Sequence, residues 1–433
     1  MTTAEFIQEY REKDTRQLAL QSSRFPDVDM PYALDQIKGW QTARRKLPTW
    51  AACAGIVYPP HLSMEQCSSE PTAQYKLNLA MEWARRVDHA SSMTDLTGGF
   101  GVDFSFTSCA FASATYVERN AQLCSMVEHN LPLLGIDNAK VVCADAIDYL
   151  STLDMQTMIF LDPARRDQYG AATVMLADCT PDVVQLLPQL LKKSRFTMLK
   201  LSPMLDWHKA VEDLQGMVRE VHIVSVGGEC KELLLVLSEE IESELKVFCA
   251  DLEAGGGSGG SSRSSGSSCS SLSSEPSFPR TPSSPSAPSN ASLFVYAPGS
   301  SSPAPNSTFN IQHSTFLFEP NASIMKAGCF DELAAAYGVS PVSRNSHLFL
   351  SAEPVDGFPG RSFSIERVTT LNKRELRQAL AGIEKANIAT RNFPLSVAEL
   401  RKRLKLKDGG DVYIFATTTA EDEHLLLISH KYQ

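Results

Sequence analysis

The chain has 433 residues and a formal net charge of −10, with 43% hydrophobic and 21% charged residues. This length predicts two or three domains of about 100 to 200 residues, and the composition excludes collagen-like, disulfide-scaffold and wholly disordered proteins. The sequence has no apolar run of 18 residues, and seven of its first twenty residues are charged, which predicts a cytoplasmic protein without a membrane span or a secretory signal.

The cysteines and histidines predict neither disulfides nor a metal site. The ten cysteines are scattered and never in CxxC spacing, so we expect reduced thiols. The nine histidines form no HxxxH pair and no cluster with the cysteines. We therefore expect no structural metal.

Residues 1–89 are predicted to form an N-terminal helical domain. Leu34, Ile37 and Trp40 recur at the spacing of a helix face, and Ser68-Ser69-Glu70-Pro71 is typical of a helix start. This segment should pack against the domain that follows it.

Residues 90–244 alternate apolar strand-like runs with helical segments, which predicts a mostly parallel sheet covered by helices. Only Gly227 to Glu232 separates the last two runs, so these should pair as an antiparallel hairpin. The seven runs are Met93–Leu96, Ala114–Val117, Lys140–Cys143, Met158–Leu161, Phe196–Leu201, Val221–Val226 and Leu233–Leu237.

A low-complexity tract interrupts the rest of the chain, 245–433, which we expect to form a C-terminal domain. Of the 36 residues from Gly255 to Asn290, 16 are Ser, six are Gly and five are Pro, a composition that cannot offset its chain entropy by burial. We predict a disordered insertion over about 253–310, flanked by strands at Leu245–Cys249 and Thr315–Phe318.

The C-terminal region from Phe316 onward begins with a predicted helical segment, Ile324 to Tyr337, and later carries the basic stretch Arg401–Lys407. Residues 361–407 contain twelve Lys or Arg against four Glu, a local balance of +8 in an acidic protein. Two interpretations stay open: this part meets a polyanion, or it is a solvated face that balances the acidic body.

Carboxylates follow four successive predicted strands. Asp95 opens the turn Asp95–Gly101, and Glu118, Asp145 and Asp162 close the next three strands. Ligands of an open parallel sheet bind beyond the C-terminal strand ends, where glycines let a ligand approach the backbone. Such an acidic rim would repel a pyrophosphate.

The ligand that this rim predicts is cationic or free of phosphate. The dinucleotide pattern GxGxxG also fails, because Phe104 stands where its last glycine belongs. S-adenosylmethionine fits, since it has a sulfonium, an ammonium and a ribose diol but no phosphate, and Glu118 could accept both ribose hydroxyls.

These motifs resemble those of class I S-adenosylmethionine-dependent methyltransferases in order and spacing. They are Asp-x-Thr-Gly-Gly-x-Gly (95–101), Val117-Glu118-Arg119-Asn120, Cys143-Ala144-Asp145-Ala146 and Leu161-Asp162-Pro163-Ala164-Arg165. More closely, the chain resembles a bacterial group of methyltransferases that carry a C-terminal THUMP-like domain. The stretches that resemble this group's signatures are Leu62–Lys76, Val224–Leu235, Pro320–Lys326 and Asn345–Phe349.

The resemblance implies an α/β fold: a Rossmann-like, seven-stranded class I methyltransferase sheet, with an N-terminal helical segment and a C-terminal α+β THUMP-like domain. It implies S-adenosylmethionine as cofactor and RNA (tRNA or rRNA) as partner, because THUMP domains bind RNA. The cofactor-binding residues that it implies are Asp95, Thr97, Gly99, Gly101, Glu118, Arg119, Asp145 and Ala146.

The resemblance also implies that Asp162, Pro163 and Arg165 are catalytic. Asp162-Pro163 matches the start of the Asp/Asn-Pro-Pro-aromatic motif of amino-methylating enzymes, in which the acid accepts a hydrogen bond from an exocyclic amine. Ala164 and Arg165 depart from the motif, although an arginine plane can still stack on a base. The Asp-Pro-x-Arg form is also similar to uracil-C5 methyltransferases, but no cysteine matches their nucleophile.

Structural alternatives exist for each of these acids. Glu118 and Asp145 could cap the helices that follow them, and Asp162 could form an ion pair with Arg165 or Arg166. The predicted function is a methyltransferase acting on a base in structured RNA. The alternatives are a methyltransferase with a small-molecule or protein acceptor, and a non-catalytic RNA-binding protein.

Overall fold

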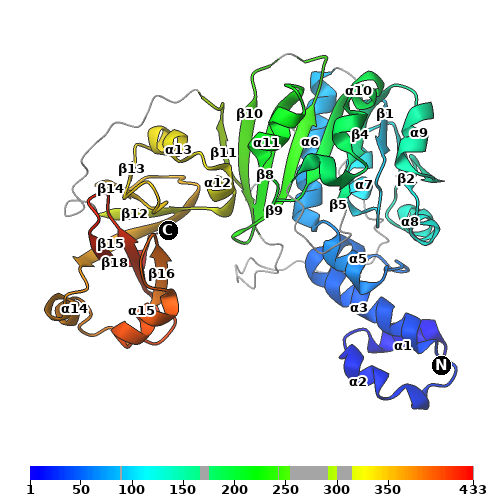
Figure 1. Cartoon of the computed structure of the whole chain (residues 1–433). Helices are drawn as coiled ribbons and strands as arrows, with labels where there is room; N and C mark the ends of the chain where they lie inside the picture. Colours follow the sequence, from blue (N-terminus) through cyan, green and yellow to red (C-terminus); the bar gives the residue numbers. More distant parts are fainter. Residues whose placement is uncertain (88–89, 166–174, 242, 254–290, 300–314, 433) are drawn as a thin grey trace, which may run out of the picture. The chain divides into compact units, whose positions relative to one another are not determined.

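The computed structural model describes residues 1–87, 90–165, 175–241, 243–253, 291–299 and 315–432 (Figure 1). The chain forms two compact units. The first contains Met1–Val221, Glu232–Glu244 and Leu252–Ala291, and the second His222–Lys231, Leu245–Asp251 and Ser292–Gln433. Within the described ranges, no helix is both long enough and apolar enough to cross a membrane.

The predicted N-terminal helical segment is confirmed. Thr2 and Glu5 form a capping box at the first helix, and Ser69 precedes the long α6, whose first turn contains Pro71. Trp83 and Lys76 are buried on α6. The helices are α1 (Thr3–Tyr10), α2 (Thr15–Ala19), α3 (Met30–Lys46), α4 (Pro48–Ala52), α5 (His61–Gln66) and α6 (Glu70–Arg86).

All seven predicted apolar runs are strands of one nine-stranded sheet, whose order is β11-β10-β8-β9-β7-β4-β1-β2-β3. The predicted hairpin strands β8 and β9 are neighbours, and β9 runs antiparallel to β7. The seven strands are β1 (Ser92–Asp95), β2 (Ser113–Glu118), β3 (Ala139–Cys143), β4 (Gln156–Leu161), β7 (Ser194–Leu201), β8 (Val218–Val226) and β9 (Glu229–Leu237).

Helices join the parallel strands and flank the sheet (Figure 1). Central strands are buried along most of their length; β4 contains the unbroken apolar run Met158–Leu161, and most of β7 is buried as well. The connecting helices are α7 (Val102–Thr107), α8 (Ala121–Leu133), α9 (Ala146–Thr152), α10 (Val183–Lys193) and α11 (Trp207–Asp213). A two-stranded ribbon, β5 (Ala164–Arg165) with β6 (Cys179–Thr180), follows β4.

One expectation for the C-terminal region is wrong. The stretch predicted as disordered insertion contains a strand, β11 (Ala291–Tyr296), because Leu293 to Tyr296 form an apolar run that the serine content conceals; residues 254–290 and 300–314 lie outside the described residues. The helical segment predicted over Ile324–Tyr337 is confirmed and consists of two helices, α12 (Ala322–Ala327) and α13 (Phe330–Tyr337). Gly328, with φ of 72°, ends the first of them.

The second unit contains a seven-stranded sheet of order β13-β14-β12-β15-β18-β17-β16. The predicted flanking strands are confirmed as β10 and β12. The remaining elements are β10 (Lys246–Leu252), β12 (Phe316–Pro320), β13 (Ser340–Pro341), β14 (Phe349–Ser351), β15 (Gly360–Thr369), α14 (Lys373–Ala379), β16 (Asn387–Arg391), α15 (Val397–Leu404), β17 (Val412–Thr418) and β18 (His424–Lys431).

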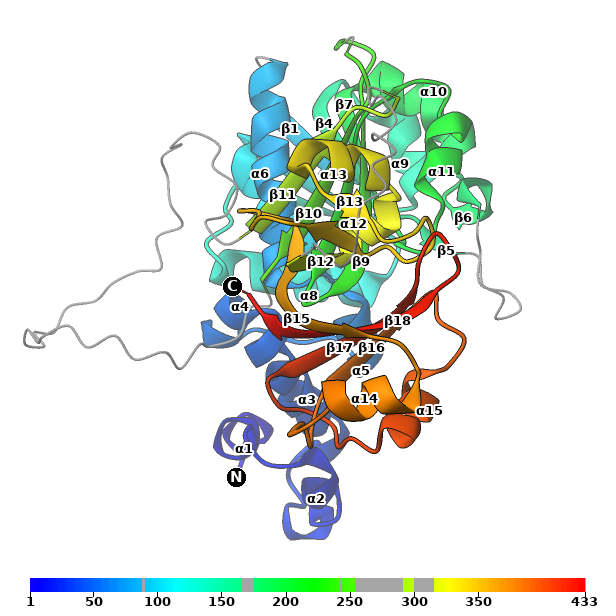
Figure 2. The ribbon, with the colours of Figure 1, turned by 90° about the vertical axis from the view of Figure 1, so that its left-hand side faces the viewer.

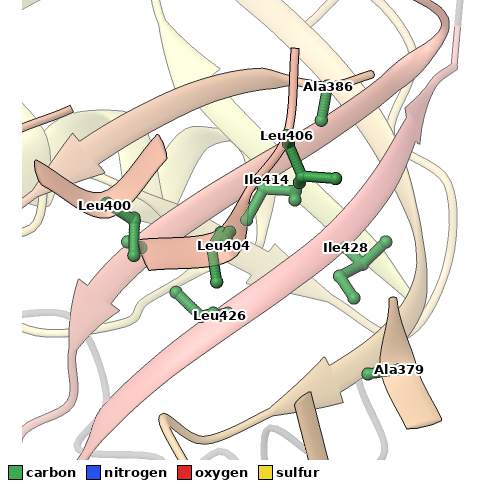
Figure 3. Close-up of a cluster of buried hydrophobic side chains, with 9 residues drawn as sticks. Ala379, Ala386, Leu400, Leu404, Leu406, Ile414, Leu426 and Ile428 are labelled. Atoms are coloured by element: carbon green, nitrogen blue, oxygen red, sulfur yellow. The ribbon is translucent and has the colours of Figure 1, made fainter. Parts of the chain in front are cut away.

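The two faces of this second sheet bury different apolar cores. Helices α14 and α15 cover one face (Figure 2), where Leu400 and Leu404 pack on Ile414 and Leu426 (Figure 3). Neighbouring residues along each strand point to opposite faces. The other core therefore uses the alternate positions: Leu317, Phe363, Phe415 and Leu427, with Ala389 packed against them.

Candidate functional site

The ends of β1, β2, β3, β4 and β7 meet at one edge of the first sheet. These strands are parallel neighbours, and Asp95 lies opposite Tyr116 and Phe160 in the register. Parallel pairing places the carboxyl ends of all five strands on the same side. The predicted acids at 95, 118, 145 and 162 therefore share this edge.

The glycine turn after β1 closes tightly on one side and is open on the other. A Cβ on Gly98 would lie 2.1 Å from the Tyr116 ring, so only glycine fits there. Gly99 has φ of 55°, and a Cβ there would meet nothing nearer than the Thr97 carbonyl oxygen at 3.8 Å. Gly101, with φ of 82°, precedes α7. The turn thus presents bare backbone at Gly99.

Hydrogen bonds join five of the predicted residues across three strand ends. The Thr97 amide donates to Asp95 Oδ1 at 2.9 Å, and the Asp162 amide donates to Thr97 Oγ1 at 2.6 Å. The Gly99 amide donates to Glu118 Oε2 at 3.1 Å. The turn after β1 is therefore held to the ends of both neighbouring strands.

Asp145, Ala146 and Arg119 form none of these hydrogen bonds. Asp145 is exposed and caps α9, since Oδ1 accepts from the amides of Ile147 and Asp148, which is the alternative that the sequence left open. Ala146 is the first residue of that helix. Arg119 is exposed beside Glu118. Glu118 does not cap α8, because Asn120 does so.

Asp162 pairs with a lysine that the sequence analysis did not single out. Lys200 Nζ on β7 lies 2.7 Å from Asp162 Oδ2 and 3.0 Å from Asp103 Oδ2. Asp162 thus forms an ion pair with Lys200; Arg166 and the Arg165 side chain, the partners considered from the sequence, lie outside the described residues. Pro163 is buried.

A second buried lysine extends these contacts. Lys76 on α6 is fully buried; its Nζ lies 3.0 Å from Asp103 Oδ1 and forms a short ion pair with Glu232 on β9. The Ser68 hydroxyl donates to Asp103 at 2.8 Å and also contacts Glu232. We call the five charged residues Lys76, Asp103, Asp162, Lys200 and Glu232 the lysine network.

The contacts within the lysine network shift the pKa values of Lys200 and Asp103. Burial alone would lower the pKa of Lys200, but the Asp103 and Asp162 carboxylates raise it well above its usual value. Burial would raise the pKa of Asp103, yet Lys200 and Lys76 hold it far below its usual range. Lys200 is therefore a cation at every physiological pH.

The pKa values of Asp95 and Asp162 are raised, in contrast to that of Asp103. Burial raises the pKa of Asp95 to about 8, against the Thr97 amide that favours its charged form. Burial also raises the pKa of Asp162, and Lys200 opposes this effect. The acidic rim is therefore less negative than four isolated carboxylates would be.

Sequence reasoning missed the lysine network because its members lie far apart in the chain. One signal was present: Lys200 interrupts the apolar strand Phe196–Leu201, and Lys76 lies on the apolar side of a helix. A buried lysine needs a carboxylate partner. That rule predicts partners without identifying them.

S-adenosylmethionine fits the residues at this edge. The open backbone at Gly99 is a place where a ligand can approach, and half-buried Glu118 accepts one amide on each carboxylate oxygen, from Gly99 and Asn120. Each carboxylate oxygen has two acceptor sites, so both can still accept from a ribose diol. Across the described ranges, no group of three or more His, Cys, Asp or Glu is placed to hold a metal.

Two family models match the C-terminal region. Residues 360–431 match the THUMP domain-like family, and residues 316–359 match a ferredoxin-like domain. The expected THUMP-like domain is thus confirmed. A search of curated proteins finds no match.

One solved structure is similar over the whole chain. It is a protein from Porphyromonas gingivalis W83 described as a candidate methyltransferase, with 28% identity, a TM-score of 0.78, and coverage of 100% of this chain and 98% of that one. An O-methyltransferase from Bacillus cereus in complex with SAH also matches, with 11% identity, a TM-score of 0.33, and coverage of 46% of this chain and 91% of that one. A SAM-dependent methyltransferase from Agrobacterium tumefaciens matches with 16% identity, a TM-score of 0.29, and coverage of 39% of this chain and 60% of that one. The sheet topology, the whole-chain similarity to the Porphyromonas protein and the family match together show a class I methyltransferase-type α/β fold followed by a THUMP-like domain.

Proposed function

We propose that the protein is an S-adenosylmethionine-dependent methyltransferase that modifies a base in structured RNA, tRNA or rRNA. The observation that carries the proposal is the joined edge of the first sheet, where the bare backbone at Gly99 is hydrogen-bonded to Glu118 and linked through Thr97 to Asp162. The methyltransferase-type fold and the whole-chain similarity to the Porphyromonas protein support it.

The cofactor would lie along the turn Asp95–Gly101. Glu118 would accept the ribose hydroxyls, and Asp145 with Ala146 would contact the adenine at the end of β3. S-adenosylmethionine, when bound, supplies a methyl group activated by a sulfonium. The chain's own contribution is to hold the acceptor in line with that methyl group, and such positioning can lower a barrier by about 7 to 11 kcal/mol.

Asp162 is the residue that we propose to orient the acceptor. An ionised carboxylate can accept a hydrogen bond from an exocyclic amine and so direct the nitrogen lone pair. Lys200 donates to Oδ2 of Asp162. Its positive charge lowers the pKa of Asp162, which burial raises. The second oxygen, Oδ1, then faces the acceptor. The Arg165 side chain would stack on the base.

RNA as the substrate rests on the THUMP-like segment and on charge. THUMP domains bind RNA, and residues 360–431 match that family. The basic stretch predicted at Arg401–Lys407 forms the end of α15 and the residues after it, with Lys402, Arg403, Lys405 and Lys407 exposed. An exposed basic surface on an acidic protein favours a polyanion at that surface.

Methyl transfer to RNA from a strain that lacks the gene tests the proposal. The full-length protein and tritium-labelled S-adenosylmethionine should label RNA from the deletion strain and leave RNA from the parent strain unlabelled, because the parent's sites are already methylated. Asp162→Ala should reduce the rate at least about 100-fold, because alanine removes the oxygen that orients the acceptor. Equal labelling of both RNA preparations, or full activity of Asp162→Ala, would contradict the proposal.

A further inference from the structure

The second unit has a polar end on the sheet face opposite α14 and α15. Leu317, Phe363 and Ala389 pack in the core of that face. Because side chains alternate, the residues two positions along these strands, Glu319, Arg361 and Arg391, point to the same face. Three strands far apart in the chain thus bring charged side chains to one place.

These three residues form what we call the arginine cluster. Arg361 Nε donates to Glu319 Oε2 at 2.8 Å, and its Nη2 donates to the same oxygen. Arg391 Nη2 donates to Glu319 Oε1 at 2.7 Å. The Glu319 side chain is 4% exposed, whereas those of Arg361 and Arg391 are 54% and 37% exposed. A buried carboxylate therefore holds two guanidinium groups that both reach the surface.

The cluster has more positive charge and more donors than Glu319 can satisfy. Two guanidinium groups face one carboxylate, which leaves an excess of one positive charge. Each guanidinium has five N–H donors, and Glu319 receives only three of them in total. Arg391 Nε is buried without a hydrogen-bond partner among the described residues.

Further unsatisfied polar atoms lie around the cluster. Asn321 directly follows β12, which carries Glu319, and His347 is near enough to Arg391 for the guanidinium to add to the effect of burial in lowering the pKa of the imidazole. The His347 ring stacks on Phe330 with 4.3 Å between centroids. Asn321 Nδ2 and His347 Nδ1 are both buried and, in the described part of the chain, lack a partner.

We propose that the arginine cluster binds a phosphate group of the RNA substrate. Arginine forks match the spacing of phosphate oxygens and form two parallel hydrogen bonds to them. The cluster supplies the required charge excess, and Glu319 fixes both forks before the ligand arrives, which lowers the entropy lost on binding. This inference rests on the proposed function, because it takes RNA as the source of the phosphate.

The arginine cluster is separate from the basic stretch Arg401–Lys407. Arg391 is the last residue of β16. At the other end, just before that strand begins, Arg401 donates to the carbonyl of Ala386, and the backbone of Lys407 forms a β-bridge with that of Lys385. The two positive regions therefore contact opposite ends of β16. The cluster would add a phosphate contact outside the basic stretch Arg401–Lys407.

Filter binding of labelled bulk tRNA, and separately of total rRNA, tests the inference over a series of salt concentrations. With the full-length protein, Arg361→Gln should weaken RNA binding about tenfold and reduce the slope of log K against log salt by about 0.9, the value for one lost phosphate contact. Arg361→Lys should recover only part of the affinity, because lysine lacks the fork. Arg374→Gln, at an exposed arginine of α14, is the matched control and should bind as the wild type does.

Each other outcome has a definite meaning. Arg361→Gln leaves Glu319 paired with Arg391, so thermal unfolding should show a folded variant. Wild-type affinity and slope in Arg361→Gln and Arg391→Gln would overturn the inference while leaving methyl transfer intact. Pyrophosphate could raise the thermal stability of the wild type and not that of Arg361→Gln, while the two proteins bind RNA equally. That result would assign the cluster to a free phosphate. No RNA binding by the wild type would reject the RNA substrate itself.

Discussion

The two units of the protein use ion pairs in opposite ways. In the first unit, the lysine network places two lysines among three carboxylates, and the lysines are almost fully buried. In the second, the arginine cluster places two arginines on one carboxylate, and the arginines reach solvent. The first arrangement has an excess of negative charge and the second an excess of positive charge.

The sign of the excess and its exposure determine what each arrangement can do. A buried group with excess carboxylates can hold an ionised Asp162 in a fixed place and accept from cationic or amine ligands. An exposed group with excess guanidinium can attract a phosphate. The comparison predicts that substitutions in the lysine network change stability and catalysis, whereas those in the arginine cluster change RNA binding.

The largest effect is expected for Lys76→Met. Lys76 is fully buried between Asp103 and Glu232, so its removal leaves two buried carboxylates without this cation. Losing one partner of a buried ion pair typically costs about 3–5 kcal/mol, and urea unfolding should show a loss of this size. Lys209→Met, which removes surface ion pairs to Glu212 and Asp213, is the control and should leave the urea midpoint unchanged. Equal midpoints for Lys76→Met and wild type would contradict the role of the network.

Lys200→Met should mainly affect catalysis. Without the ammonium, burial together with the Asp103 and Glu232 carboxylates raises the pKa of Asp162 further, so less of it is ionised at neutral pH. We expect kcat to fall about 100-fold, RNA affinity to stay constant, and the acidic limb of the pH profile to move to higher pH.

Two variants control this prediction. Lys200→Arg keeps the positive charge and should restore part of the activity, and Lys192→Met, at an exposed position on α10, should be as active as wild type. A uniform loss of activity at all pH values, with no shift of the limb, would assign Lys200 a purely structural role.

Much of the first sheet follows from the sequence, because its signals are local. The seven apolar runs, the hairpin and the glycine turn each depend on neighbouring residues, and all appear where they were expected. The partners of Lys200 could not be predicted. Asp103 lies on a helix and Glu232 on a late strand, and only the folded sheet brings them together.

The second unit was harder to interpret, for the same reason. The basic stretch was visible in the sequence, but the arginine cluster joins Arg391 of β16 to Glu319 of β12, although three strands separate β16 from β12 in the sheet order. The strand β11 was hidden by the composition around it. Local patterns identify elements and leave their tertiary pairing open.

Asp95→Asn should change how stability depends on pH. Burial raises the pKa of Asp95 to about 8, against about 4 in an unfolded chain, so the folded protein holds a proton that unfolding releases. Stability contributed by this group is present at low pH and declines between roughly pH 4 and pH 8, by at most about 1.4 kcal/mol per pH unit.

Asparagine keeps the oxygen that accepts from the Thr97 amide but cannot ionise. The free energy of unfolding of Asp95→Asn should therefore change less with pH than that of the wild type. Urea unfolding at pH 5, 6, 7 and 8 measures the difference between the two proteins. Parallel curves would show that Asp95 is already ionised in the folded state, and that the edge of the first sheet is more negative than we describe.

The smallest effect is expected for the double variant Lys402→Gln with Arg403→Gln. It tests whether basic side chains fixed by a carboxylate contribute more to RNA affinity than basic side chains that no carboxylate fixes. These exposed side chains follow the buried Leu400 on α15, so binding RNA must restrict rotamers that no carboxylate fixes beforehand. We expect RNA affinity to fall about threefold for the pair, less than the tenfold loss from one arginine of the cluster, because preorganisation lowers the entropy that each phosphate contact costs. Filter binding at matched salt compares the two directly. If the double variant loses more affinity than Arg361→Gln, then the number of basic residues, and not their fixed geometry, governs RNA binding in the second unit.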